Sequence, residues 1–272
     1  MTISITKARD YVYQQGRLYE SALFGYLFEG RSIEKVHDAL RAYRNPDGGW
    51  GHGMEMDLRT PDSNPAALEY ALGFVNNWNL PAGDLFEGAS AWVVSQANPD
   101  GTLRNPDSLF DYPIAPWWVE MKGQTAPSSI VGNLNKLGLA TKELLQLGET
   151  YAQNYLKLEN IAANEWFFMA YHGYHYYMYT SSEAQFHDAV IENMRTCADT
   201  MPDNQLYSVL SFASTPDTPF AKALPELVTR ALDYAQAHQQ AEGHWLDQHG
   251  LSGWYPHVTL LTLYALRSHG RL

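Results

Sequence analysis

Two kinds of apolar segment alternate along the chain. In residues 33–43 and 224–235, apolar side chains recur at helical spacing while charged side chains occupy the opposite side. Residues 66–75 and 258–266 are instead apolar on nearly every side. A one-sided apolar stripe is typical of a helix with one wet face, and apolarity all round is typical of a buried helix. The alternation therefore predicts an outer layer of half-exposed helices around an inner layer of buried ones.

Residues 258–266 leave a second interpretation open. Their valine and threonine content also suits a buried β-strand. Because residues 66–75 form a comparable run of apolar residues, we favour a helix for both segments.

Three turns with a shared pattern punctuate the chain: Asn45-Pro-Asp-Gly-Gly-Trp50, Asn98-Pro-Asp-Gly-Thr-Leu103 and Gln240-Ala-Glu-Gly-His-Trp245. Each places an acidic residue before a glycine, a combination that favours a tight turn. The first two lie about one helical hairpin apart, and the gap before the third would hold about two or three more. Together with the two layers, these repeats predict an all-α fold. We expect a single α/α-toroid (barrel) of about five to six helical hairpins over residues 1–272.

Charge and cysteine content restrict the partners. The formal net charge is −12, and such an acidic surface repels nucleic-acid phosphates and anionic lipid headgroups. The N-terminus lacks the apolar core of a signal peptide, and residues 258–266 are too short to span a bilayer. Cys197 is the one cysteine, so an intrachain disulfide and a cysteine-rich zinc site are excluded. We expect a cytoplasmic protein with no membrane span and no nucleic-acid partner, and the oligomeric state stays open.

The repeats also resemble those of a known superfamily. Residues 96–101 and 240–245 resemble degenerate copies of the glutamine–tryptophan repeat of squalene cyclases. Residues 48–53 and the alanine-rich residues 64–72 resemble a glycine-rich turn and inner helix of protein prenyltransferase β-subunits, and residues 253–266 resemble a late inner helix of those subunits. The chain is thus similar to the terpenoid cyclase and protein prenyltransferase superfamily, including bacterial prenyltransferase-like proteins. The resemblance implies an α/α-toroid with a central pocket.

The residues central to three chemistries of this superfamily are missing. The sequence has no Asp-x-Asp-Asp run, with which squalene cyclases protonate their substrate, and no Asp-Asp pair for magnesium. Of the zinc ligands of protein prenyltransferases, only His257 matches approximately, because Cys197 lacks the accompanying aspartate. The resemblance therefore implies a fold more strongly than a reaction.

Residues 51–63 carry the strongest candidates for chemistry. A histidine with nearby carboxylates can act as an acid–base pair or bind a divalent metal. We therefore predict His52, Glu55 and Asp57 as catalytic residues at the mouth of the central cavity, and Arg59 as a substrate-binding residue. The alternative is structural: Asp57 caps a turn and Arg59 pairs with a neighbouring carboxylate.

A metal ion is a further hypothesis. The first and last hairpins are neighbours in a toroid, which makes His257 a candidate ligand together with His52 and Glu55. Nitrogen and oxygen ligands suit zinc or another divalent ion. Because the spacing matches no recognised metal motif, the identity of any cofactor stays open.

Aromatic residues are abundant, with 18 tyrosines, 10 phenylalanines and 8 tryptophans. Rings can line a cavity for an apolar or sugar-like ligand, and their faces attract positive charge. We predict a set of substrate-binding rings, namely Trp117, Trp118, Tyr171, Tyr174 and Trp254. His172 and His175 lie three apart on one helical face, and we interpret them as core histidines bonded to tyrosines.

Three hypotheses about function follow. The first is an enzyme that resembles prenyltransferases or cyclases and binds a hydrophobic small molecule, with isoprenoids as one candidate class. The second is a carbohydrate-active α/α-barrel, either a hydrolase or a lyase, which paired carboxylates and stacked rings would serve equally well. The third is a binding or scaffold toroid without catalysis.

Overall fold

The protein is almost entirely helical. The structure, a computed structural model, describes residues 3–120 and 124–272. Within these ranges, the only strands are β1 (Leu103–Arg104) and β2 (Gln124–Thr125), which pair antiparallel. The predicted all-α class is therefore confirmed. Among the described helices, not one combines the length and the apolarity that a membrane crossing requires.

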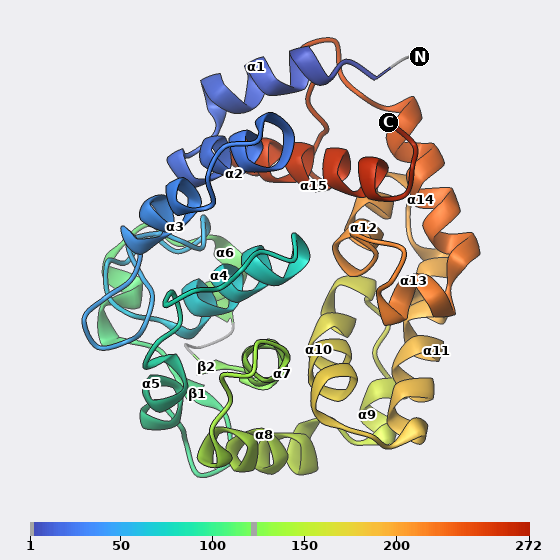
Figure 1. The fold of residues 1–272 in the computed structure, drawn as a ribbon. Helices are drawn as coiled ribbons and strands as arrows, with labels where there is room; N and C mark the ends of the chain where they lie inside the picture. Colours follow the sequence, from blue (N-terminus) through green and yellow to red (C-terminus); the bar gives the residue numbers. More distant parts are fainter. Residues whose placement is uncertain (1–2, 121–123) are drawn as a thin grey trace. The chain divides into compact units, whose positions relative to one another are not determined.

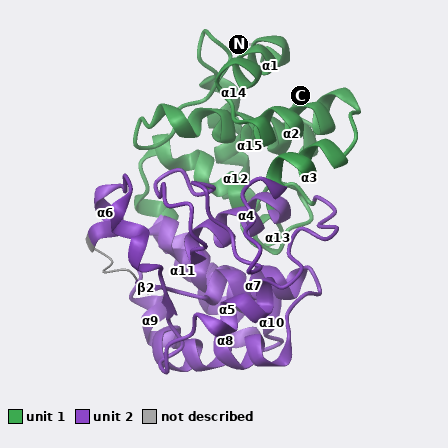
Figure 2. Ribbon diagram, turned by 90° about the vertical axis from the view of Figure 1, so that its left-hand side faces the viewer, with its two compact units in different colours: residues 1–40, 77–79, 198–272 green, residues 41–76, 80–197 purple. Residues whose placement is uncertain are grey.

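The chain divides into two compact units that are interleaved in the sequence (Figure 2). Unit 1 contains residues 1–40, 77–79 and 198–272, and unit 2 contains residues 41–76 and 80–197. The prediction of a single domain over residues 1–272 stays a prediction.

Unit 2 holds most of the helices and both strands. Its elements are α4 (Pro65–Asn77, whose last residue belongs to unit 1), α5 (Ala89–Ser95), β1, the 3-10 helix η1 (Asp107–Asp111), α6 (Pro116–Glu120), β2, α7 (Ser128–Lys136), α8 (Lys142–Tyr155), α9 (Leu158–Ala162), η2 (Phe167–Ala170), α10 (Tyr171–Thr180) and α11 (Ala184–Thr200, which ends in unit 1). Helix α7 packs along α10 and also contacts α8, which in turn contacts α5.

Unit 1 joins the two ends of the chain. Its elements are α1 (Ile5–Gln15), α2 (Leu18–Glu29), α3 (Glu34–Arg41), the 3-10 helix η3 (Asp203–Ser208), α12 (Val209–Phe212), α13 (Pro219–Ala223), α14 (Pro225–Ala237), η4 (Ser252–Trp254) and α15 (Tyr255–Ser268). The last helix, α15, packs against α1, α2, α12 and α14 (Figure 1). Helix α15 therefore lies against the early helices α1 and α2 within this unit.

The two predicted kinds of helix are both observed. Helices α3 and α14 bury one side each and expose their charged residues, such as Lys35 and Arg230. Residues 258–266 are a helix and not a strand, and all of them are buried except Tyr264. In α4 the burial is interrupted by one narrow, partly exposed strip of Glu69, Tyr70 and Gly73. That strip carries a carboxyl group on an otherwise apolar helix.

The three predicted turns share one backbone geometry. In each turn the N–H of the first residue donates to the carbonyl four positions later, over 2.9, 2.8 and 2.8 Å from Asn45, Asn98 and Gln240. The glycine of each turn has a left-handed φ, which is 91° at Gly48, 91° at Gly101 and 101° at Gly243. L-residues with a side chain rarely adopt this conformation, which explains why glycine recurs at this position.

Each turn glycine also lies against the backbone of a helix or of its cap. A Cβ on Gly48 would meet the carbonyl oxygen of Gly88, the N-cap of α5, at 3.0 Å. A Cβ on Gly101 would meet the backbone nitrogen of Tyr151 in α8 at 2.7 Å. The third turn, at Gly243, lies in the same way against Lys7 in α1. Within unit 1, the last turn of the chain is therefore seated on its first helix.

The aspartate of the first turn is a stabilising residue, and we expect its removal to cost about 1–2 kcal/mol. Asp47 accepts hydrogen bonds from the Gly49 N–H at 2.9 Å, from Ser63 Oγ at 2.8 Å and from Trp92 Nε1 at 3.1 Å. Its counterpart in the third turn, Glu242, is exposed and makes no side-chain hydrogen bond to any described residue. Thermal unfolding should therefore show a lower Tm for Asp47→Ala and little change for Glu242→Ala; equal effects would contradict this role.

Candidate functional site

The predicted catalytic residues lie on a surface loop of unit 2. His52 is exposed, has a φ of 55°, and places Nε2 2.9 Å from Asn45 Oδ1. Glu55 and Asp57 are partly exposed, and Glu55 Oε1 accepts the Asp57 N–H at 3.1 Å. These contacts order the loop, and a catalytic role for the three residues stays a prediction.

The structure places three of the predicted substrate-binding residues in one region of unit 2. The loop pairs with the segment before α6 through a bridge between Leu58 and Ile114, and the Arg59 N–H donates to the carbonyl oxygen of Pro113 at 3.2 Å. Trp118 packs against the small core cluster beneath this bridge, whereas Trp117 is 44% exposed. Arg59 and both tryptophans therefore belong to one part of unit 2.

His257 and Trp254 belong to unit 1. The His257 ring meets the rings of Trp78 and Trp254 edge-on, with centroids 5.2 and 5.8 Å apart. Burial lowers the pKa of His257 to about 4, so the imidazole is neutral at pH 7. Over residues 3–120 and 124–272, no three His, Cys, Asp or Glu side chains group as a metal site requires. His257 belongs to unit 1 and His52 and Glu55 belong to unit 2, so a divalent metal held by these three residues stays a prediction.

A buried polar cluster lies elsewhere in unit 2, where α4, α7 and α10 meet. Its centre is Glu69 on α4, whose side chain is 14% exposed. Glu69 Oε2 accepts a hydrogen bond from the Tyr171 hydroxyl at 3.1 Å. Oε1 is buried and has no hydrogen-bond partner among the described residues. Burial raises the pKa of Glu69 to about 7, although Tyr171 and Ser129 act in the opposite direction.

Tyr171 connects this carboxyl to a second one. Burial raises the pKa of the Tyr171 hydroxyl well above 10, and the negative charges of Glu69 and then Glu55 raise it further. The predicted substrate-binding residue Tyr171 thus bonds to Glu69 and also feels the charge of Glu55, a predicted catalytic residue. Tyr174, the other predicted ring of α10, is 1% exposed and packs edge-on against Tyr179.

The two histidines of α10 bond to serines of α7. Ser128 Oγ lies 3.3 Å from His172 Nδ1, and Ser129 Oγ lies 2.8 Å from His175 Nδ1. Burial lowers the pKa of His172 to about 4 and that of His175 to about 3, so both rings are neutral at pH 7. The interpretation of both as buried histidines is consistent with these contacts, but these bonds go to serine hydroxyls rather than to tyrosines.

Buried amides complete the network. Asn133 Nδ2 donates to Ser129 Oγ at 3.3 Å, and Asn76 Nδ2 donates to Asn133 Oδ1 at 3.1 Å. We call the following residues the Glu69 cluster: Glu69, Asn76, Ser128, Ser129, Asn133, Tyr171, His172 and His175. Polar groups buried at this density are retained in proteins when they are bonded to one another or when they serve a ligand.

A glycine allows α7 and α10 to approach closely enough to form this cluster. A Cβ on Gly132 would overlap the carbonyl oxygen of His175 and come within 3.0 Å of the Tyr176 nitrogen. Any larger residue would separate the serines of α7 from the histidines of α10. The geometry of the cluster therefore depends on a small residue at position 132.

Glu69 and the two serines were missed by the reasoning from sequence, although a signal was present. Glu69 is the one charged residue in the run of residues 66–75. A charged side chain is rarely buried unless it has a partner or a function. The serines gave a weaker signal, because serine is common at the start of a helix whether or not it faces a site.

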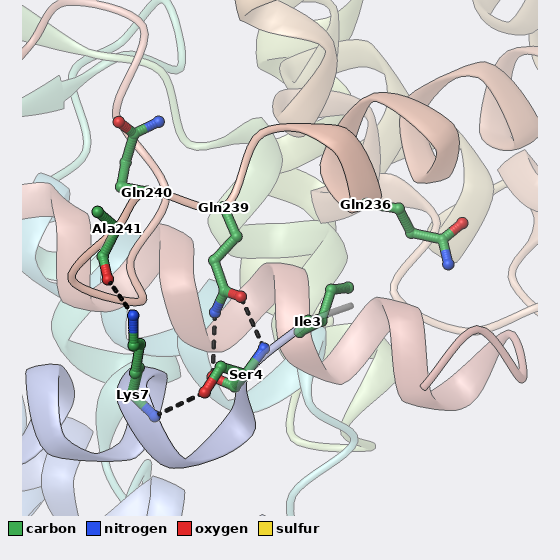
Figure 3. Close-up of a pocket in the computed structure, with 7 residues that line it drawn as sticks. All are labelled: Ile3, Ser4, Lys7, Gln236, Gln239, Gln240 and Ala241. Carbon is green, nitrogen blue, oxygen red and sulfur yellow. Dashed lines mark hydrogen bonds between the residues drawn. The ribbon is translucent and has the colours of Figure 1, made fainter. Parts of the chain in front are cut away.

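A surface pocket of about 390 Å³ occurs at the end of α14 in unit 1 (Figure 3). Gln239 bonds the Ser4 N–H and carbonyl oxygen at 2.8 and 3.1 Å, and Lys7 Nζ donates to the carbonyl oxygen of Ala241 at 2.8 Å. These groups fasten the N-terminal residues to the third turn. Because they are already bonded to one another, the pocket offers less to a ligand than the Glu69 cluster does.

Comparison of the chain with protein-family models, with curated proteins and with solved structures finds no match in any of the three.

Proposed function

We propose that the chain is an α/α-toroid related to the terpenoid cyclases and protein prenyltransferases. In this proposal it binds a hydrophobic small molecule, with isoprenoids as one candidate class, and exchanges a proton with a polar group of that molecule at Glu69. The single observation that carries the chemistry is the buried Glu69 carboxyl, which has one oxygen held by Tyr171 and the other without a donor from the described residues.

The repeated turns support the toroid. Three turns of one geometry recur from the first part of the chain to the last, and each is seated on a helix or its cap. In unit 1 the third turn rests on α1, and α15 packs beside α1 and α2. An arrangement in which the last hairpin adjoins the first helices is what a closed ring of hairpins requires.

The electrostatics of Glu69 support proton transfer. A carboxyl with a pKa of about 7 is present in both its acid and its base form at neutral pH. His172 and His175 are neutral at pH 7, so neither adds a positive charge that would lower the pKa of Glu69. An acid of this strength suits transfer to or from oxygen or nitrogen, and it is too weak to protonate an alkene as squalene cyclases do.

A carbohydrate-active enzyme is the second candidate, and one observation favours it. Glu69 accepts a hydrogen bond from the Tyr171 hydroxyl, whereas Glu55 acts on that hydroxyl through its charge alone. Two carboxyl groups in unequal environments are the pair that glycoside hydrolysis uses. Exposed rings nearby in the sequence, Trp166 and Phe168, could stack on a sugar.

Thermal shift with two probe classes tests the proposal. Farnesol and geranylgeraniol should raise the Tm of the wild-type protein, and native mass spectrometry should show one bound molecule. The rise should be smaller in Glu69→Gln and unchanged in Glu87→Gln, because Glu87 lies on the exposed surface of unit 2. A Tm rise with xylohexaose and none with the alcohols would favour the second candidate. If neither class binds, the proposed function is wrong.

A further inference from the structure

Glu69 has an oxygen that is ready to accept a hydrogen bond from a ligand. Oε1 is buried and lacks a partner within the described chain, while Oε2 is held by Tyr171. The Ser129 hydroxyl lies nearby, but it has a single proton, which His175 Nδ1 takes when it acts as the acceptor at 2.8 Å. A buried acceptor without a donor costs free energy, and a ligand that supplies the donor recovers it.

No positive charge of the described residues balances this carboxyl. The nearest charged candidate, His172 Nδ1, lies 3.9 Å from Oε1, but burial lowers the pKa of His172 to about 4. Lys136 lies over the Tyr179 ring at 4.9 Å and acts on His175. Glu55 adds further negative charge near Tyr171. Among the described residues, no cation therefore acts on the Glu69 carboxylate itself.

Aromatic rings connect this negative site with the surface. The Tyr171 and Phe168 ring centroids lie 5.5 Å apart, and those of Phe168 and Trp166 lie 5.6 Å apart. Phe168 and Trp166 are 45% and 48% exposed, whereas Tyr171 is partly buried. Such rings offer an apolar surface, and their faces attract a cation.

We propose that the Glu69 cluster binds an apolar amine. The protonated nitrogen donates a hydrogen bond to Glu69 Oε1, and the apolar body lies along Tyr171, Phe168 and Trp166. This inference rests on the proposed function and names the polar group of its ligand. An ammonium group supplies both the missing donor and the missing positive charge, and the net charge of −12 attracts such ligands from solution.

Protons compete with the amine for Glu69. A bound cation favours the carboxylate, so binding releases protons near pH 7, and affinity falls as the pH drops below 7 by up to about tenfold per pH unit. Tyr151 and Tyr171 have raised pKa values and stay protonated across this range, and His172 stays neutral. Glu55 also acts on Tyr171. The variant Glu55→Gln measures how much of the pH dependence of amine binding comes from Glu55 and how much from Glu69.

Isothermal titration calorimetry at pH 7 with 4-phenylbutylamine and 4-phenylbutanol tests the inference, since the two probes differ only in the polar group. The amine should bind at least about tenfold more tightly than the alcohol. Titrations in phosphate and in Tris should give different heats, because released protons are taken up by the buffer. Glu69→Gln should remove the preference for the amine and the proton release, and Glu87→Gln should change neither.

Phe168→Ala provides a second measurement, because it alters the surface for the apolar body and leaves the carboxyl in place. The variant should lower the affinity of the protein for each of the two probes by about fivefold. Equal affinity for the two probes, or no binding of the amine, would overturn the inference. The proposed function is judged separately, because it fails only when the isoprenoid alcohols also leave the Tm unchanged.

Discussion

Glu69→Gln is expected to stabilise the protein by about 3 kcal/mol at pH 8 and to leave its stability nearly unchanged at pH 4. Burial raises the pKa of Glu69 from the ordinary 4.5 to about 7. The folded protein therefore holds this proton more tightly than the unfolded chain does. As the pH rises from 4.5 to 7, ionisation favours the unfolded chain and the fold loses stability. Glutamine has nearly the same shape and no charge, so it avoids the loss.

Urea denaturation at pH 4 and pH 8 measures this effect in wild type, Glu69→Gln and the surface control Glu87→Gln. Burial also raises the pKa of Glu20 in unit 1 to about 7, so all three proteins keep the pH dependence that comes from Glu20. The difference between wild type and Glu69→Gln isolates Glu69. A difference that does not grow with pH would show that the Glu69 carboxyl is hydrated, and the acid–base proposal would lose its basis.

Gly132→Ala is expected to destabilise the protein by about 3 kcal/mol, at the upper end of the range for overpacked cores. The added methyl group would overlap the carbonyl oxygen of His175. Its neighbours are backbone atoms of α10, which cannot move aside as the end of a flexible side chain can. Relief requires α7 and α10 to separate, and this separation would lengthen the contact between Ser129 and His175.

The matched control is Gly73→Ala in α4, where a Cβ would have no neighbour within 4 Å. Alanine is the better helix former by about 1 kcal/mol, so this variant should be slightly more stable than wild type. Urea denaturation of both variants gives opposite signs if the close approach at position 132 is responsible. A loss of stability in both would instead point to a general intolerance of alanine in these helices.

Much of the local fold follows from the sequence because local physics determines it. The apolar stripes of residues 33–43 and 224–235 predicted which faces are buried, since helical periodicity alone sets them. The glycines at positions 48, 101 and 243 predicted their turns, because a left-handed φ strongly favours glycine. These features depend on a few consecutive residues and on no distant partner.

The candidate site could not be read in the same way. Glu69 and Tyr171 are 102 positions apart, and only the packing of α4 with α10 makes them partners. Residues 51–63 carry polar groups that are close in sequence, yet His52 bonds to Asn45 of the preceding turn. The high density of polar residues in this segment indicated a surface loop and not a buried site. A solitary carboxyl group in an apolar helix was the better indication of buried chemistry.

The seating of the third turn on α1 has a consequence for biosynthesis. Residues 1–40 are synthesised long before α15, which packs against α1 and α2. All of unit 2 has been synthesised by residue 197, when the apolar faces of α1 and α2 still lack α15. The faces of α1 and α2 that pack against α15 therefore stay uncovered until residue 268, the end of α15, has been synthesised.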